Sequence, residues 1–554
     1  MGIKTIDYAI IGAGAAGTYS AWRLANDENI DASQVAVFDF QTFEGKAHIG
    51  GRLWSPHLAG LGNVRKAELG GMRYLTSQTV VSSLIKELEL DTVPFVVESN
   101  DILYYFRNKI LRADEITDPK KLPYAVGKME QGLTAGELIS YAIESIVPNA
   151  PYLKDNEWLE IKKNFKVEGR HLYEWGFWNL LQRVLTQEAC SYAKEGQGYD
   201  TIPSNWNAGD AMEWFFSDFN ASVSYMYVKD GYQTIPETLL QQACDKGVEL
   251  HHPYQLQKWE QGEEGKIILT FLHEGKKERI HCKQLILAMP RRSLELIEMP
   301  ANPKLAKLIP AVKPQAMFKF FACYDFPWWR TFGIASGRTI TDLPLRQIYY
   351  WGSNYKKFFD HAPEKTRGVK NRNDNSMIMS YLDGRDVSFW QPLFESVKKG
   401  ERERLSLKCE SAEMHNETSV EFNSKIQPRA FAIWDNLDTQ DPAVAAVVEF
   451  IQDQLRQTHG VNYIPMPYSL AYADWTTDPF GGAYNLWNPG YKSWEVTNQI
   501  RKPYEHLPVY ICGEAYSVKQ GWVEGALETA EQVMQSNLKL QKPSWLPDDW
   551  LPKE

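Results

Sequence analysis

The chain of 554 residues has few cysteines, no long basic run and no long apolar run. Its six cysteines lie far apart and form no CxxC pair, which indicates free thiols in a reducing compartment rather than a disulfide framework or a metal site. The formal charge is −10, from 60 basic and 70 acidic side chains, so nucleic acid is not expected as a partner. No run of 18 apolar residues occurs, so no membrane span is expected.

The N-terminus has no leader-like segment. An apolar run begins at Ile6 and leaves no room for a signal peptide, so we expect a cytoplasmic location. Aromatic residues are abundant, with 19 Trp, 28 Tyr and 24 Phe. They belong either to large cores or to a ligand cavity, and composition does not separate the two. The length predicts roughly two to four domains.

A strand, a glycine turn, a helix and a second strand follow each other between Ile6 and Asp39. The first strand ends at Ile11, the helix runs to about Asn26, and the second strand ends in an acid. The turn reads Gly12-Ala13-Gly14-Ala15-Ala16-Gly17. This arrangement predicts a dinucleotide-binding βαβ unit.

Each part of the turn has a physical role in such a site. Gly12 permits the tight turn, Gly14 lets the backbone approach a pyrophosphate, and Gly17 lets the helix pack closely on the strand. The helix N-terminus presents free N–H groups and the positive end of its dipole to the phosphates. Asp39 follows Gly17 at the distance where an acid accepts hydrogen bonds from a ribose.

Two further glycine pairs precede arginines. In Gly50-Gly51-Arg52 the arginine either faces the pyrophosphate or is a surface residue of a simple turn. In Gly70-Gly71-Met72-Arg73 the arginine has apolar neighbours and needs a partner, because an unpaired buried charge is costly. That partner is either a protein carboxylate or a substrate carboxylate, which an arginine holds with two parallel hydrogen bonds.

The rest of the chain predicts alternating helical and strand regions. Residues 134–187 are helical in pattern, and the segment Ala211–Phe219 belongs either to a core or to an aromatic cavity wall. Lys319 in the middle of a strand is either exposed at an edge or placed in a site. Residues 398–413 read as a solvated insertion. We expect strands at 254–259, 267–271, 284–288, 315–324, 376–382 and 508–514. We expect helices from the turn at 231–236 to about residue 247, at 443–457, and from 521 to about 538.

Three markers in this order resemble the flavin-containing amine oxidase family. They are the N-terminal glycine turn, Gly50-Gly51-Arg52, and Gly513-Glu514 followed by Gly521-Trp522. Within the family, Gly71-Met72-Arg73 is similar to the L-amino acid oxidases and their monooxygenase relatives. The resemblance implies that Arg73 holds the substrate carboxylate, which simple amine and polyamine substrates lack.

The resemblance also implies roles for individual residues. Tyr381 shares the carboxylate with Arg73, Lys319 holds a water beside flavin N5, and the carbonyl of Gly521 accepts from the substrate amine, with Trp522 as the aromatic wall. Glu514 lies near the ribityl chain and Leu256 near the adenine. No cysteine occurs where monoamine oxidases attach their flavin, so FAD is expected to be non-covalent. The expected FAD contacts are Gly12, Gly14, Ala15, Ala16, Gly17, Asp39, Gly51, Arg52, Gly70, Gly71, Met72, Arg73, Leu256, Gly513, Glu514, Trp522 and Val523.

The expected fold is α/β, with a Rossmann-like FAD-binding domain of the amine-oxidase type, a mixed-sheet substrate domain and a helical domain. The FAD-binding domain takes residues 1–75, 225–312 and 465–540, and the substrate domain 76–125 and 313–464. The helical domain takes 126–224, and 541–554 form a tail. Relatives imply a possible homodimer, and no metal site is expected.

The expected function is an FAD-dependent L-amino acid oxidase, which converts an amino acid and oxygen to a 2-oxo acid, ammonia and hydrogen peroxide. One alternative is an amino acid 2-monooxygenase that gives an amide. Another is a flavin-free, non-catalytic escort-type protein of the same fold. The aromatic content favours bulky apolar or aromatic substrates, whereas an acid such as Glu213 would favour lysine or arginine.

Overall fold

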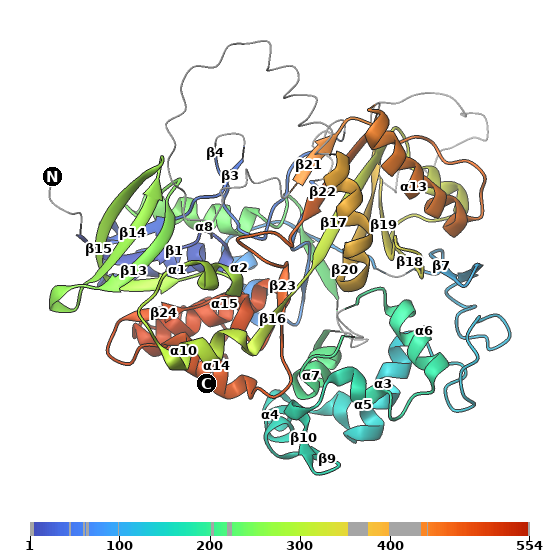
Figure 1. Ribbon diagram of the computed structural model, residues 1–554, viewed down its shortest axis with the longest axis horizontal. Helices are drawn as coiled ribbons and strands as arrows, with labels where there is room; N and C mark the ends of the chain where they lie inside the picture. The colour runs from blue at the N-terminus through green and yellow to red at the C-terminus, as the bar shows by residue number, and fades with distance from the viewer. Residues whose placement is uncertain are drawn as a thin grey trace.

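The computed structural model describes residues 5–43, 46–58, 61, 66–97, 99–200, 204–218, 224–352, 375–397, 434–439 and 441–551. Figure 1 shows one large sheet on the left, a second at the upper right and a group of helices at the lower right. In the described part of the chain, every helix is too short or too polar to cross a lipid bilayer. The predicted insertion at 398–413 lies outside the described residues.

The first sheet has seven strands and brings together the beginning, the middle and the end of the chain. Its order is β12-β2-β1-β15-β14-β13, and β24 also pairs with β15. Strands β12, β2, β1, β15 and β24 are parallel, whereas β13, β14 and β15 form an antiparallel meander. The strands are β1 (Thr5–Ile11), β2 (Val35–Phe38), β12 (Glu249–His251), β13 (Gln255–Gln261), β14 (Ile267–His273), β15 (Lys276–Leu287) and β24 (Val509–Ile511).

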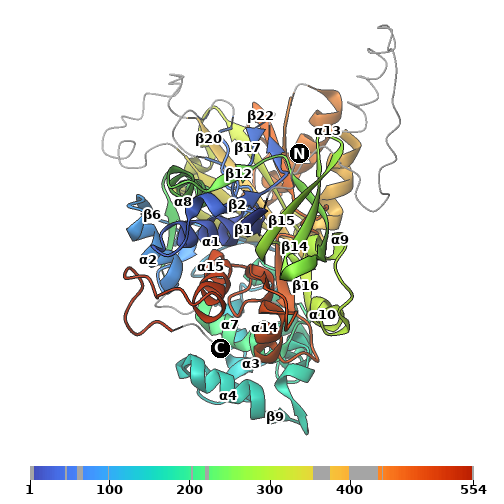
Figure 2. The same ribbon diagram turned by 90° about the vertical axis from the view of Figure 1, so that its left-hand side faces the viewer.

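Helices cover this sheet, and two of its parallel strands, β2 and β24, are apolar over their whole length rather than alternating. Every residue of β2 and β24 is buried. Helix α1 packs against both α8 and α15, and α15 also contacts α2; Figure 2 shows α1, α8, α15 and α2 close to one another. The helices are α1 (Ala15–Ala25), α2 (Thr79–Glu87), α8 (Thr234–Asp245), α9 (Arg291–Leu296), α10 (Pro303–Leu308), α14 (Ser493–Arg501) and α15 (Val523–Gln532).

The second sheet has eight strands in the order β21-β22-β17-β20-β19-β18-β7-β8. All of its pairs are antiparallel except β18 with β7. Helix α13 (Pro442–His459) lies beside it (Figure 1). The strands are β7 (Leu103–Phe106), β8 (Lys109–Arg112), β17 (Met317–Tyr324), β18 (Gly337–Thr341), β19 (Gln347–Trp351), β20 (Ser376–Asp383), β21 (Trp434–Leu437) and β22 (Ser469–Asp474).

Strand β17 lies inside this sheet, between β20 and β22. Lys319 is directly opposite Tyr381 on one side and Ala473 on the other, and its exposed fraction is 0%. Of the two interpretations of Lys319, exposure at a sheet edge is therefore wrong.

The third region is helical, as residues 134–187 predict. It holds α3 (Ala135–Ile146), α4 (Asp155–Asn164), α5 (Phe177–Leu181), α6 (Gln187–Gln197) and α7 (Ala208–Asp218). Helix α3 begins at a capping box, in which Thr134 and Glu137 each accept from the other's backbone N–H. The remaining strands form small two- and three-stranded sheets: β3 (Thr42–Phe43), β4 (Lys46–Ala47), β5 (Tyr74–Leu75), β6 (Thr92–Pro94), β9 (Lys166–Val167), β10 (Arg170–His171), β11 (Tyr225–Val228), β16 (Val312–Gln315) and β23 (Tyr484–Trp487).

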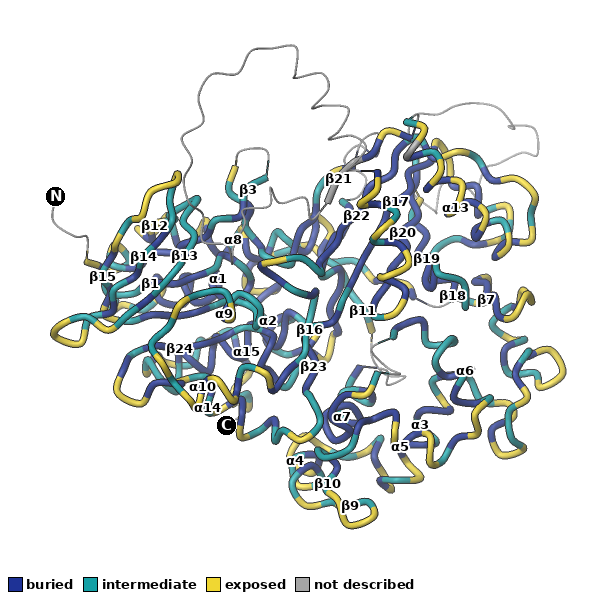
Figure 3. The backbone as a smooth tube through the Cα atoms, viewed as in Figure 1, coloured by how far each residue is buried: buried dark blue, intermediate teal, exposed yellow. Residues whose placement is uncertain are grey.

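The expected α/β fold class is confirmed, and most expected elements are present. Strand β15 begins earlier than predicted. The prediction missed its first half because those residues are charged and have no apolar pattern that indicates a strand. The last helix is α only to Gln532 and continues as a π-helical turn over Val533–Asn537. Figure 3 shows that the central strands of both sheets are buried, while exposed residues are concentrated in loops and outer helix faces. The domain boundaries stay a prediction.

Candidate active site

A cavity of about 280 Å³ is lined by residues from all three regions. The two glycine pairs and the first glycine turn contribute backbone, the second sheet contributes Tyr381, and α7 contributes Trp214 and Asp218. Two of the sequence-predicted site residues, Gly17 and Lys319, do not line it. The others do: Gly12, Gly14, Ala15, Ala16, Asp39, Gly51, Arg52, Gly70, Gly71, Met72, Arg73, Leu256, Tyr381, Gly513, Glu514, Gly521, Trp522 and Val523.

Two glycines of the first turn have different steric roles. A Cβ on Gly17 would lie 1.8 Å from the carbonyl oxygen of Gly12, so the helix approaches the strand as closely as the sequence predicts. A Cβ on Gly14 would meet protein only at 3.8 Å, which is an ordinary contact distance. Gly14 lines the cavity, so the space that its missing side chain leaves is open to a ligand.

Asp39 ties the second strand to the glycine turn. Its Oδ2 accepts from the N–H of Ala13 at 2.6 Å, and its Oδ1 accepts from the N–H groups of Phe40 and Gln41 at 2.7 and 2.9 Å. Burial raises the pKa of Asp39, and these backbone bonds oppose the rise. The carboxylate remains part of the cavity wall, where its oxygens still have lone pairs for a ligand.

The second glycine segment lies against the first. The N–H of Gly50 donates to the carbonyl of Ala13 at 2.9 Å, and Gly51 has a φ of +59°, which glycine adopts without strain. Arg52 forms an ion pair with Glu514 at 3.1 Å and donates to the carbonyl of Ala483 at 2.8 Å. Its interpretation as a plain surface residue is therefore wrong, and it joins the cavity wall.

Glu514 organises the C-terminal part of this wall. Its carboxylate accepts from the N–H of Gly521 at 2.9 Å and from both the N–H and the side-chain amide of Asn485, at 2.8 and 3.0 Å. Gly521 has a φ of +82°, which favours glycine at this position. Immediately after it, Trp522, Val523 and the start of α15 line the cavity, so the positive end of the helix dipole lies beside it.

Arg73 is buried, and no carboxylate of the described residues forms an ion pair with it. Its Nη2 donates to the hydroxyl of Tyr199 at 3.0 Å, and its guanidinium lies 4.0 Å from the ring centroid of Tyr225 and 5.1 Å from that of Phe95. Burial alone lowers the pKa of Arg73, but the surrounding tyrosines raise it above its usual value, so the group stays charged. Among the described residues, Nη1 has no hydrogen-bond partner. A buried, charged guanidinium with one nitrogen that lacks a partner among the described residues can bind an anionic ligand.

Besides Tyr225, three more tyrosines surround this arginine. The hydroxyls of Tyr199 and Tyr349 are 2.7 Å apart, and the ring of Tyr199 meets that of Tyr381 edge-on, with centroids 5.2 Å apart. Tyr199 and Tyr381 line the cavity with Arg73. Sequence reasoning found Tyr381 through the family resemblance but missed Tyr199, which has no motif around it.

Lys319 lies behind the cavity wall. Its ammonium donates to the carbonyls of Glu68 and Gly70 at 3.0 and 2.6 Å and lies 5.0 Å from the ring centroid of Tyr381. Burial lowers its pKa to about 7. Its contacts within the protein are thus to the backbone that leads to Arg73.

The side of the cavity formed by α7 combines indole rings with one acid. The indole N–H of Trp522 donates to Asp218 at 2.5 Å, and that of Trp214 donates to the carbonyl of Gln520 at 3.3 Å. Burial raises the pKa of Asp218 to about 6. The sequence analysis considered Glu213 as an acid that would favour lysine or arginine substrates. In the structure Glu213 pairs with Lys162 at 2.6 Å and does not line the cavity.

The aromatic segment of α7 divides between the two roles that the sequence left open. Trp214 lines the cavity, whereas Phe215 is buried in the core of the helical region. Phe219 lies outside the described residues. Among the described residues that line the cavity there is no cysteine and no histidine.

A model of one protein family matches most of the chain. The family is described as flavin containing amine oxidoreductase, and the match covers residues 16–409 and 423–534. Its two parts together include both arginine-bearing glycine segments and the Gly513-Glu514 marker.

Known proteins similar to the chain include two from molluscs. Aplysianin-A from Aplysia kurodai is 25% identical over 97% of this chain and 91% of its own length, and achacin from Lissachatina fulica is 25% identical over 96% and 93%. An L-amino-acid oxidase from Sistrurus catenatus edwardsii is 24% identical over 69% of this chain and 67% of its own.

Solved structures with the same fold include putrescine oxidase. A wild-type structure bound to putrescine aligns with a TM-score of 0.63 at 16% identity, over 96% of this chain and 99% of that one. A triple mutant of the same enzyme aligns with a TM-score of 0.65 over the same shares. At this identity the similarity concerns the fold alone.

Proposed function

Because the chain belongs to the flavin containing amine oxidoreductases, whose model matches most of its length, we propose that it is an FAD-dependent L-amino acid oxidase. The proposed products are a 2-oxo acid, ammonia and hydrogen peroxide, with molecular oxygen as the second substrate. The observation that carries this proposal is Arg73: a charged, buried guanidinium in the cavity wall that, among the described residues, has one nitrogen without a hydrogen-bond partner and forms no ion pair with a carboxylate.

FAD is the cofactor of this family, and the described residues fit it. Gly14 leaves unfilled space at the helix N-terminus, which is where a pyrophosphate binds in dinucleotide sites. Asp39 is available to the ribose, and Arg52 and Glu514 to the ribityl and phosphate part. When bound, FAD supplies the acceptor for two electrons, chemistry that protein side chains do not provide.

Arg73 and Tyr381 are proposed to hold the substrate carboxylate, Arg73 through its free Nη1 and Tyr381 through its hydroxyl. The carbonyl of Gly521 accepts a hydrogen bond from the neutral amine. With both ends of the amino acid held, its Cα–H has one orientation in the cavity, which lowers the entropic part of the barrier. No side chain is needed as a general base if the amine binds neutral.

The proposed substrates have bulky apolar or aromatic side chains. Trp214, Trp522 and Phe480 supply apolar surface to the cavity wall. Asp218 is a specific reason to consider cationic side chains as well, because it is an acid in the wall near Arg73. Assay of both substrate types decides between them.

The test is a peroxide assay of the purified yellow protein against the twenty amino acids in both enantiomers. The proposal expects peroxide and 2-oxo acid from L-amino acids and no product from amines that lack a carboxylate. An amide and carbon dioxide in place of peroxide would identify the monooxygenase alternative. A colourless protein that takes up no FAD would favour the escort-type alternative, which membership of a flavin-containing family disfavours.

The homodimer, the cytoplasmic location and the water held by Lys319 beside the flavin also stay predictions. Analytical ultracentrifugation checks the first and localisation in the source cells the second. The third is checked by a structure with FAD bound.

A further inference from the structure

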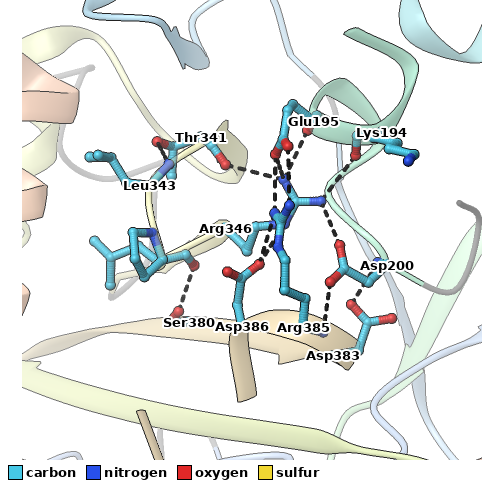
Figure 4. Close-up of polar contacts among 12 residues, drawn as sticks. Lys194, Glu195, Asp200, Thr341, Leu343, Arg346, Ser380, Asp383, Arg385 and Asp386 are labelled. Carbon is cyan, nitrogen blue, oxygen red and sulfur yellow. Dashed lines mark hydrogen bonds and ion pairs between the residues drawn. The ribbon is translucent and has the colours of Figure 1, made fainter. Parts of the chain in front are cut away.

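A cluster of charged side chains around one buried arginine includes Asp200, the residue that follows the cavity residue Tyr199. At its centre is Arg346, whose exposed fraction is 1%. Its guanidinium pairs with Glu195 at 2.7 Å, Asp200 at 3.1 Å and Asp386 at 3.2 Å (Figure 4). Arg346 also has a φ of +50°, a backbone conformation that costs free energy for a residue other than glycine. This cost and the burial of the charge are offset by contacts to three separate segments.

Asp200 directly follows Tyr199, which lines the cavity, and three contacts hold it. Its Oδ1 accepts from Arg346, its Oδ2 accepts from the backbone N–H of Arg385 at 2.8 Å, and its own N–H donates to Asp383 at 2.9 Å. Arg346 immediately precedes β19, Asp383 is the last residue of β20, and Arg385 lies in the turn that follows β20. Figure 4 shows these side chains around Asp200. Both the side chain and the backbone of Asp200 are therefore fixed to the second sheet.

The residue before Asp200 is Tyr199, whose hydroxyl accepts from Arg73. Tyr199 follows Gly198, the C-cap of α6, and belongs to no helix or strand. Regular backbone hydrogen bonds thus do not determine where its hydroxyl lies. A Cβ on Gly198 would lie 2.9 Å from Cγ of Gln347, so the chain also passes very close to β19 at this point.

The same cluster reaches a second tyrosine of the cavity. Asp383, which accepts from the N–H of Asp200, also accepts from the hydroxyl of Tyr484 at 2.8 Å. Tyr484 lines the cavity next to Gly521, and its ring carbon is the nearest atom, at 3.8 Å, to a Cβ built on that glycine. Both ends of the proposed substrate site therefore contact a tyrosine that this cluster supports.

We propose that Arg346 and Asp200 are positioning residues of the substrate site: their buried ion pair holds the loop that carries Tyr199 and keeps its hydroxyl against the guanidinium of Arg73. This inference rests on the proposed function, because it assumes that Arg73 binds the substrate carboxylate. Buried ion pairs contribute little net stability but fix geometry, and a carboxylate fork needs its guanidinium held to within a fraction of an ångström.

A double-mutant cycle on the FAD-loaded protein tests the proposal. The probe is benzoate, a carboxylate that is not oxidised, and its Kd is measured by isothermal titration calorimetry. Asp200→Asn keeps the shape of the side chain and removes its charge, and Tyr199→Phe removes the hydroxyl. Each single variant is expected to raise the Kd about tenfold. Because Asp200 acts through Tyr199, the double variant is expected to raise it no further than about tenfold.

The proposal is overturned if the double variant raises the Kd about a hundredfold, the product of independent effects. It is also overturned if Asp200→Asn lowers Tm without changing the Kd, since that is a purely structural role. If Asp200→Asn does not fold or load FAD, Arg346→Lys replaces it in the same cycle with the same expected result. Glu531→Gln is the matched control, because it neutralises a buried acid paired with Arg23 that does not line the cavity, and it should leave the Kd unchanged.

Failure of the proposed function gives a different result. If the wild-type holoenzyme does not bind benzoate, or if Arg73→Lys binds it as tightly as wild type, Arg73 is not the carboxylate site. If Arg73→Lys loses benzoate while the Asp200 variant keeps it, the proposed function stands and only the positioning role is wrong.

Discussion

The ammonium of Lys319 donates to the carbonyl of Gly70 at 2.6 Å, from the central strand of one sheet to the glycine segment that leads to Arg73. It also donates to the carbonyl of Glu68, and the indole of Trp475 donates to the carbonyl of Leu69 between them at 2.7 Å. Three successive carbonyls are thus held by the second sheet. The backbone before Arg73 is fixed to β17 and to the residue after β22.

Lys319 should make stability depend on pH. Burial lowers its pKa from 10.5 to about 7, so between these values the unfolded chain binds a proton that the folded chain does not. The contribution of Lys319 to the free energy of unfolding therefore rises with pH over this window, by at most about 1.4 kcal/mol per pH unit. Urea unfolding of wild type and Lys319→Met at pH 6, 8 and 9.5 measures it.

The expected result is a difference between the two proteins that moves in favour of wild type as the pH rises. Parallel stability profiles for wild type and Lys319→Met would contradict the lowered pKa. Lys319→Arg is the matched variant, because arginine stays protonated throughout this range and should also lack the pH dependence.

Arg73→Ala should strongly raise KM for amino acids and lower kcat/KM. Losing a charge-assisted two-point contact costs about 2–4 kcal/mol in kcat/KM. Arg73→Lys keeps the charge but loses the planar fork, so we expect an intermediate value. Steady-state kinetics with the best L-amino acid, together with the flavin content of each variant, measures this. Unchanged kinetics in Arg73→Ala would falsify the carboxylate role.

Tyr381→Phe should have a smaller effect in the same direction. It removes one neutral hydroxyl from the carboxylate site and keeps the ring that packs against Tyr199. The expected loss in kcat/KM is about 1 kcal/mol, or roughly fivefold. The same assay checks it, and a loss as large as that of Arg73→Ala would mean that Tyr381 does more than bind the carboxylate.

Gly14→Ala and Gly17→Ala form a matched pair on one turn. At Gly14 a Cβ meets protein only at 3.8 Å, so the fold should keep its apoprotein Tm, whereas FAD affinity should fall because the methyl group occupies ligand space. At Gly17 a Cβ would lie 1.8 Å from a backbone oxygen, so both Tm and FAD affinity should fall. Thermal unfolding and FAD titration of both apoproteins separate the two cases. Equal effects in both variants would contradict these separate roles.

The dinucleotide-binding unit was predictable because its parts are close in sequence. Strand β1, the glycine turn and α1 occupy adjacent residues, and each glycine has a steric reason that local geometry supplies. Arg52 and Arg73 were noticed because they follow glycine pairs, Glu514 was found by resemblance, and all three line the cavity. Their partners within the protein were not predictable from the local sequence.

Other parts of the site depend on contacts between distant segments. Tyr199 lies 126 residues from Arg73 and belongs to no sequence motif, so its contact with Arg73 could not be predicted from the sequence. Glu213 and Asp218 are both acids on the same helix, and only the packing of α7 turns one toward Lys162 and the other toward the cavity.

The sequence by itself predicted the dinucleotide-binding turn, because short spacings and local backbone geometry carry that information. It also singled out Arg73 as an arginine that needs a partner, and the order of its three markers indicated the family by resemblance. Only the tertiary structure decided that Lys319 is buried, that Arg73 has no carboxylate partner among the described residues, and that Arg346 lies behind Tyr199. The reason is physical: burial, charge pairing and pKa depend on which distant segments fold against a side chain, and a linear spacing does not contain those contacts.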